Sequence, residues 1–203
     1  LISGGTAICG GSAIAALAPA IGASQADVAV AMAVVFILNG VALFVFPFVG
    51  HLLDLSQSSF GLWSALAIHD TSSVVGAGAA YGAQALSIAT TVKLTRALWI
   101  VPMAFIAAKL WKTDKSAKVP PFIIAFVGAS LLATLIPSGE GLWNAFGAIG
   151  GRLMTATLFL VGACLTMEDV KLAGVRPLVK AVILWLIVSS ASLGAILVGW
   201  ISI

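Results

Sequence analysis

Long apolar segments alternate with short polar stretches along most of the chain. Five apolar segments are long enough, or nearly so, to cross the roughly 30 Å hydrocarbon core of a bilayer as helices. They comprise residues 27–48, 84–111, 121–136, 142–166 and 177–201. The pattern predicts an all-α, polytopic membrane protein built as a helical bundle.

Two further apolar segments, residues 3–21 and 59–81, are interrupted by short polar or glycine-rich motifs. The motifs run from Ile8 to Ile14 and from Ile68 to Val74, and both read Ile-x-x-x-Ser-small-β-branched at an offset of 60 residues. A bilayer tolerates non-helical backbone only where protein or a wet cavity surrounds it. The motifs therefore predict two discontinuous helices, broken or re-entrant. Paired interruptions of this kind point to the substrate site of a secondary transporter with inverted repeats.

The sequence leaves the path of the interrupted segments open. If segment 59–81 crosses the membrane, the two motifs have the same orientation. If it folds back as a re-entrant hairpin, one span separates two hairpins and the motifs form an inverted pair. The polar loop at 50–58 contains no Lys or Arg, which favours the hairpin.

Composition supports the membrane assignment. Of 203 residues, 61% are hydrophobic and 8% are charged, and the mean hydropathy is +1.17, which excludes an ordinary soluble domain. Cys9 and Cys164 lie in apolar segments, so we expect no disulfide framework. The sequence starts at Leu1, close to the first motif, and we expect it to be a C-terminal part of a longer chain that forms a single transmembrane domain.

The basic residues predict an orientation. The loops at 109–118 and 168–180 contain seven of the ten Lys and Arg residues, and two predicted spans separate them, so both loops lie on one side. The positive-inside rule makes that side cytoplasmic and puts the C-terminus outside. We expect an integral protein of a bacterial plasma (inner) membrane, in which the net charge of +3 reports orientation and not nucleic-acid binding.

Three basic residues lie near the middle of predicted spans: Lys93, Arg96 and Arg152. A charge at the bilayer centre costs about 2.5–3.5 kcal/mol, so each needs a partner or water. Asp70 is the one acidic residue at comparable depth, and His69 is beside it. The surplus of positive charge favours an anion as ligand.

The expected substrate-binding residues combine these cations with hydroxyl and backbone donors at the two motifs. They are Gly10, Gly11, Ser12, Thr71, Ser72, Ser73, Lys93, Arg96 and Arg152, with His69 and Asp70 as candidates for the coupling ion. Ser12 is also the expected N-cap of a short helix. We expect no metal and no cofactor.

Structural roles are alternatives for the same residues. Lys93 and Arg96 could pair with Asp70 or cap helix ends, and Arg152 could reach the membrane surface along its side chain. His69 and Asp70 could form a hydrogen-bonded pair at a helix break.

At the two motifs the chain resembles the YeiH-type family of sulfate exporters. The likeness is carried by residues 5–16 and 67–77, with support from Lys93-Leu-Thr-Arg96 and residues 146–152. The resemblance implies export of sulfate or a related anion. More distantly the pattern is similar to cation/proton antiporters and bile-acid symporters, which implies inverted repeats whose discontinuous helices meet at the membrane centre.

These observations predict a secondary active transporter, not an enzyme, that exports a small anion such as sulfate, a related oxyanion or a sulfonate. H⁺ or Na⁺ would be the coupling ion, and a homo-oligomer remains open. The alternatives are a Na⁺-coupled carrier of an organic anion and a passive anion channel. An intramembrane enzyme that uses His69 and Asp70 with a serine is disfavoured, because the sequence shows neither a second acid nor a set of metal ligands for it.

Overall fold

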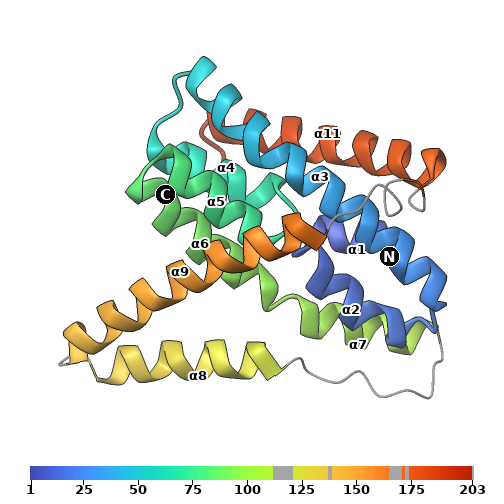
Figure 1. Cartoon of the computed structure of the whole chain (residues 1–203), viewed down its shortest axis with the longest axis horizontal. Coiled ribbons are helices and arrows are strands. Elements are labelled where there is room, and N and C mark those ends of the chain that lie inside the picture. The colour runs from blue at the N-terminus through green and yellow to red at the C-terminus, as the bar shows by residue number, and fades with distance from the viewer. Residues whose placement is uncertain (112–120, 137–138, 165–170, 172–173, 203) are drawn as a thin grey trace.

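The computed structural model describes residues 1–111, 121–136, 139–164, 171 and 174–202, and the regular structure of these residues is helical. Figure 1 shows the helices packed together, with α8 and α9 along one edge. The helices are α1 (Ile2–Ala7), α2 (Gly11–Ala20), α3 (Gln25–Leu52), α4 (Gln57–Ala67), α5 (Thr71–Tyr81), α6 (Ala83–Ala97), α7 (Ile100–Leu110), α8 (Pro121–Leu135), α9 (Glu140–Cys164) and α11 (Val175–Leu197).

Among the residues that the structure describes, three helical stretches are long and apolar enough to cross a membrane. They are Gln25–Leu52 (α3), Ala83–Leu110 (α6 and α7 together) and Val175–Leu197 (α11), and the first two are 28 residues each. α3 begins after Ser24, whose hydroxyl oxygen accepts a hydrogen bond from the Asp27 N–H at 3.1 Å. This N-cap satisfies a backbone donor that has no partner within the helix.

Helices α4 and α5 form a hairpin, called here the second hairpin. The start of α4 and the end of α5 lie at one end of the bundle, because Gln57 Oε1 accepts from the N–H groups of Gln84 and Ala85 at 3.0 and 3.3 Å. The rings of Phe60 and Tyr81 also stack there, with centroids 3.8 Å apart. Residues 68–70, the second tip, therefore lie at the far end of the hairpin, inside the bundle.

Helices α1 and α2 form the first hairpin, with residues 8–10 as the first tip. A Cβ built on Gly5 would lie 3.0 Å from Ile14 Cγ1, so the two helices are in close contact near the tip. Leu1 packs with Leu17 and Ile21 near the other end of the hairpin. The chain thus folds back on itself, as it does between α4 and α5.

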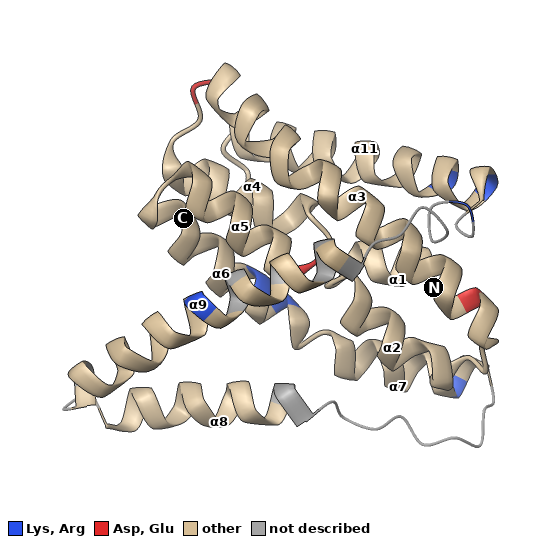
Figure 2. Cartoon of the chain, viewed as in Figure 1, with Lys and Arg blue, Asp and Glu red and all other residues tan. Residues whose placement is uncertain are grey.

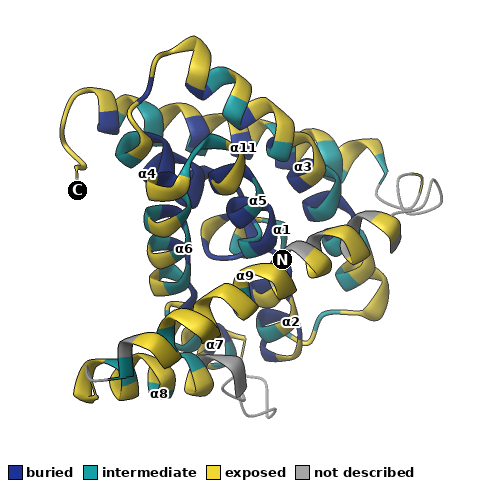
Figure 3. Ribbon diagram, turned by 60° about the vertical axis from the view of Figure 1, so that its left-hand side comes forward, coloured by how far each residue is buried: buried dark blue, intermediate teal, exposed yellow. Residues whose placement is uncertain are grey.

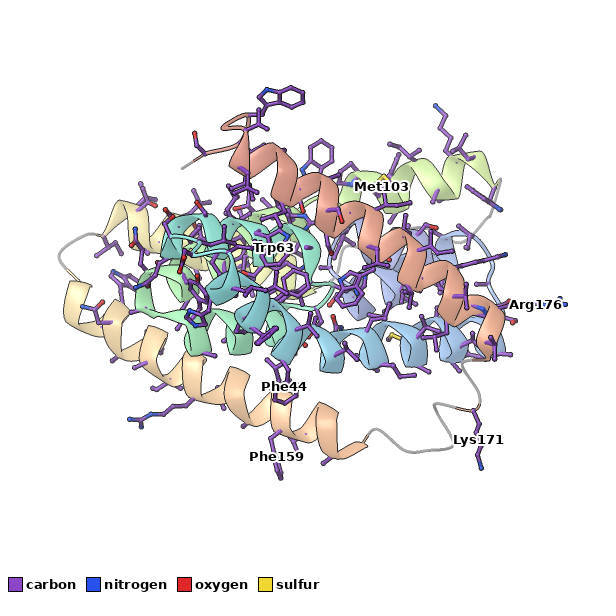
Figure 4. The ribbon with its side chains drawn as sticks, turned by 90° about the horizontal axis from the view of Figure 1, so that it is seen from above. Phe44, Trp63, Met103, Phe159, Lys171 and Arg176 are labelled. Atoms are coloured by element: carbon purple, nitrogen blue, oxygen red, sulfur yellow. The ribbon has the colours of Figure 1, made fainter. Side chains whose placement is uncertain are left out.

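The two hairpins enter from opposite ends of the bundle, because α3 connects them and runs from one end to the other. The end at which α3 starts also holds the end of α7 and the start of α11, since Leu17 and Ala20 pack with Ala104 and Ala107, and Pro177 lines a pocket with Ile21 and Asp27. We call it the basic end because Lys109 lies in the last turn of α7 and Arg176 and Lys180 lie near the start of α11. Figure 2 shows Lys and Arg positions in blue at both places. Figure 4 shows Lys171 and Arg176 at this end.

The predicted span 84–111 is not one continuous helix, because α6 ends at Ala97 and α7 begins at Ile100. Pro102 explains the interruption: it has no N–H to donate to the Leu98 carbonyl, and its ring crowds that oxygen. The N–H groups of Leu98 and Trp99 instead donate to the carbonyls three residues earlier, those of Thr95 and Arg96, at 3.2 and 3.0 Å. The second hairpin contacts α6, and the first hairpin packs against α7.

The buried core is centred on the second hairpin. Phe46 of α3 stacks on Trp63 of α4 at 4.3 Å between centroids and lies 5.8 Å from the ring of Trp185 on α11. Figure 3 shows buried residues gathered on the inner helices, while α8 and α9 are mostly exposed. Figure 4 shows Phe44 and Phe159 pointing outward, at 75% and 74% exposure. Such apolar faces suit contact with lipid chains.

Candidate functional site

The two tips meet inside the bundle. Gly10 has φ of +64°, and a Cβ built on it would lie 3.3 Å from the carbonyl carbon and oxygen of His69 and 3.2 Å from Val35 Cγ1. Glycine adopts this backbone conformation without strain, and its missing side chain lets the second tip approach. The motifs at 8–14 and 68–74 are therefore neighbours in space.

Asp70 caps helix α5. Its Oδ2 accepts hydrogen bonds from the Ser72 N–H at 3.0 Å and from the Ser72 hydroxyl. Ser72 and Ser73 are buried and Thr71 is half-buried. Thr71 thus lies directly after the second tip, at the start of α5, while the Ser72 hydroxyl is used to hold Asp70.

Asn39, near the middle of α3, holds the second tip from the other side. Its Oδ1 accepts from the Asp70 N–H at 3.1 Å, while its Nδ2 is buried without a hydrogen-bond partner. Asn39 was not among the expected site residues. Its signal in the sequence is a lone amide in a 22-residue apolar span, which packing explains equally well.

His69 is almost completely buried, at 1% exposure, and neither ring nitrogen has a hydrogen-bond partner among the described residues. Its ring lies 6.4 Å from the ring of Trp185. His69 and Asp70 do not form the hydrogen-bonded pair considered above, because Asp70 faces Ser72 instead. An unpaired buried imidazole costs free energy, so this position favours a water or a polar ligand.

The last carbonyl groups of α4 are satisfied by side chains from other helices. Lys93 Nζ donates to the Ile68 carbonyl at 2.6 Å, and Trp185 Nε1 donates to the Ala67 carbonyl at 3.1 Å. Arg96 Nη1 donates to the carbonyls of Ala65 and Leu66, the latter at 2.9 Å. A helix that ends inside a bilayer leaves such acceptors without partners and a partial negative charge. Lys93, Arg96 and Trp185 supply the hydrogen-bond donors that these carbonyls need, and the two cations also offset the negative end of the helix.

Arg96 also reaches the first hairpin, because its Nη2 donates to the Ala7 carbonyl at the end of α1 at 2.7 Å. The structure therefore brings Lys93 and Arg96 to the tips, as expected, but directs their donors at backbone carbonyls. This geometry corresponds to the alternative in which they cap helix ends.

The first tip differs from the second because α2 has no side-chain cap. Gly10, not Ser12, is the N-cap residue, so the expectation for Ser12 is wrong. The N-cap residue precedes the first helical turn, and here the positive φ at Gly10 makes that turn start at Gly11. Ser12 lies exposed in this first turn and Gly11 is buried. The first N–H groups of a helix have no partner within it, and glycine has no side-chain oxygen to accept from them.

Arg152 is not brought to the tips. It is exposed on α9 and lines a separate cavity with residues of α5 and α6, among them Val75, Ser87 and Thr91. No residue of either tip lines this cavity. Within the described ranges there is no group of three or more His, Cys, Asp or Glu residues suited to hold a metal.

The helical fold, with three membrane-length helices and polar groups buried where two hairpins meet, defines an all-α integral membrane protein. The chain belongs to the family described as Conserved hypothetical protein 698, which matches residues 1–181. This membership is consistent with the resemblance to the YeiH-type family.

Its relatives include proteins named UPF0324 membrane protein. One from Geobacter sulfurreducens is 55% identical over 98% of this chain and 64% of the relative, and one from Bdellovibrio bacteriovorus is 50% identical over 99% and 64%. A relative from Bacteroides thetaiotaomicron is 48% identical over 97% of this chain and 60% of its own length. The chain thus spans somewhat less than two thirds of these relatives. No solved structure matches it.

Proposed function

We propose that the full-length protein is a secondary active transporter that exports a small anion, such as sulfate, a related oxyanion or a sulfonate. The observation that carries the proposal is the contact between two tips that enter from opposite ends, Gly10 against His69. A ligand held between such tips is separated from each end by a single hairpin. Small movements of either hairpin would then open the site to one side at a time.

Anion binding is supported by the donors that remain at the tips. The first turn of α2, at Gly11 and Ser12, offers N–H groups, a hydroxyl and the positive end of the helix, while Thr71 offers a hydroxyl from the second hairpin. Lys93 and Arg96 contribute a positive field although their donors are engaged. Arg152 has no part in this site as proposed, because it lines a different cavity.

Coupling to protons is supported by His69. It is a titratable side chain buried at the second tip, so its protonation would change the charge between the tips directly. Coupling to Na⁺ would instead use the Asp70 carboxylate with backbone carbonyls near the break. Asp70 already accepts two hydrogen bonds from Ser72, which favours the proton.

The test is transport by the purified full-length protein in proteoliposomes. Uptake of radiolabelled sulfate, and in separate assays of sulfite, methanesulfonate and isethionate, is measured with a proton gradient, with a Na⁺ gradient and with neither. Each unlabelled anion is also tested as a competitor of sulfate. We expect saturable uptake that a proton gradient drives above equilibrium.

Other results identify the alternatives. Dependence on Na⁺ with an organic anion as the stronger competitor would support the Na⁺-coupled carrier. Flux that neither saturates nor moves uphill would support a channel. Absence of flux for all four anions would contradict the proposal.

A further inference from the structure

We infer that Arg96 is a positioning residue that fastens the first hairpin to the second, and not the ligand that binds the anion. The inference rests on the proposed function only in naming what is positioned, namely the two tips of the transport site. The fastening itself follows from the hydrogen bonds of Arg96.

The guanidinium of Arg96 bonds both hairpins at once. Nη1 donates to the carbonyls of Ala65 and Leu66 at the end of α4, and Nη2 donates to the carbonyl of Ala7 at the end of α1. In the part of the chain that the structure describes, no other side chain hydrogen-bonds the backbone of both hairpins. A planar group with donors on two nitrogens suits this task, whereas a lysine has a single nitrogen.

Lys93 provides an internal comparison. It lies one turn before Arg96 on α6, is completely buried, and bonds the second hairpin alone through the Ile68 carbonyl. Both cations therefore serve the end of α4, but Arg96 is the one whose bonds extend to α1.

The position of Arg96 along its span strengthens the inference. It lies just before the interruption at Leu98 and Trp99, on the half of the span, α6, that contacts the second hairpin. The other half, α7, packs against the first hairpin through Ala104 and Ala107. The guanidinium thus bridges the two hairpins where the span passes from one to the other, so losing it should free the first tip.

Cys9 is a native reporter for the first tip. Its side chain is 2% exposed and packs in a cluster with Ala97, the residue after Arg96. The experiment uses the full-length protein with Cys9 as its single cysteine, without substrate, and measures the rate of N-ethylmaleimide labelling. Arg96→Gln removes the charge, and Arg96→Lys keeps the charge but not the fork. Arg176→Gln, at the basic end, is the matched control.

We expect both Arg96 variants to label about tenfold faster or more than the parent protein, because each loses a charge-assisted hydrogen bond to Ala7. Arg176→Gln should label at the parent rate. Size-exclusion profiles and melting curves check folding, and Arg96→Lys keeps the test valid if the uncharged variant does not fold.

A second measurement separates positioning from binding. Sulfate affinity is determined for the parent protein and Arg96→Lys. If Arg96 is a ligand, the lysine variant weakens sulfate binding while Cys9 labels at the parent rate, and this result would overturn the inference. Faster Cys9 labelling without substrate supports it, even if the protein proves to transport no anion and the proposed function fails.

Discussion

Gly10 combines φ of +64° and ψ of −123° with close contacts to His69 and Val35. A side chain at this position would strain the backbone and push the second tip away. The sequence predicted Gly10 as a substrate-binding residue within the first motif, although glycine is also common where membrane helices pack. The role of Gly10 depends on His69, which it meets although the two are 59 residues apart along the chain.

Gly10→Ala should therefore lower stability and abolish transport. The strained conformation alone costs about 1–3 kcal/mol, and the methyl group must also displace the His69 carbonyl. Melting temperature in detergent and sulfate uptake in proteoliposomes are the measurements. Gly128→Ala on α8 is the matched control, because a Cβ there meets nothing within 4 Å. An unchanged Gly10→Ala protein would show that the tips are farther apart than described.

The sequence predicted that four polar residues gather in one region, namely Lys93, Arg96, His69 and Asp70. Their positions in the middle of apolar segments can be read directly from the order of residues. The sequence could not predict what each side chain faces. The carbonyl that Arg96 bonds on α1 is 89 residues away, and no local pattern encodes such a pairing. For the same reason Asn39 and Trp185 were missed.

At the scale of elements, α5 shows how one residue can serve structure and function together. Asp70 is the N-cap of α5 and also the acidic candidate for ion coupling. Capping requires an oxygen that accepts from the Ser72 N–H, which aspartate and asparagine both provide. Coupling to a cation requires the negative charge, which aspartate alone provides.

Two substitutions of Asp70 separate these roles. Asp70→Ala should cost about 0.5–2 kcal/mol of stability through the lost cap, read as a lower melting temperature. Asp70→Asn should keep most of the stability. If proton- and Na⁺-driven uptake both survive in Asp70→Asn, the carboxylate has no coupling role and His69 remains the candidate.

Element boundaries followed the apolar pattern except where covalent geometry intervened. The bounds of α8 and α9 agree to within about two residues with the predicted segments 121–136 and 142–166, because hydropathy is a local property of the sequence. The interruption before Pro102 was not predicted, although a proline in a helix is a visible signal. The sequence left open whether segment 59–81 crosses the membrane or folds back as a hairpin. The loop at 50–58 has no Lys or Arg and so gives only a weak indication of the side of the membrane on which it lies.

At the scale of the whole molecule, the charge distribution agrees with the arrangement of the hairpins. Lys109, Arg176 and Lys180 lie at the end where α3 starts, and residues 50–58 and 81–84 at the opposite end contain no Lys or Arg. The positive-inside rule predicts that the basic end faces the cytoplasm. The first hairpin would then enter from the cytoplasm and the second from outside.

Cysteine labelling of the full-length protein in intact cells tests this orientation. Leu53→Cys, at an exposed position in the loop before α4, should react with a membrane-impermeant maleimide added outside. Arg176→Cys should react only after permeabilisation. The reverse pattern would invert the protein, and labelling of both from outside would contradict the separation of the two ends.

The bond from Arg96 to Ala7 has a consequence for how the protein is made. The ribosome delivers the first hairpin long before residue 96 exists, so α1 and α2 must wait without the guanidinium that later holds them. Asn39, by contrast, is already in place when the second hairpin arrives. Biogenesis should therefore proceed in steps: the second hairpin meets Asn39 as it emerges, Arg96 then joins it to the first hairpin, and Trp185 bonds the end of α4 last.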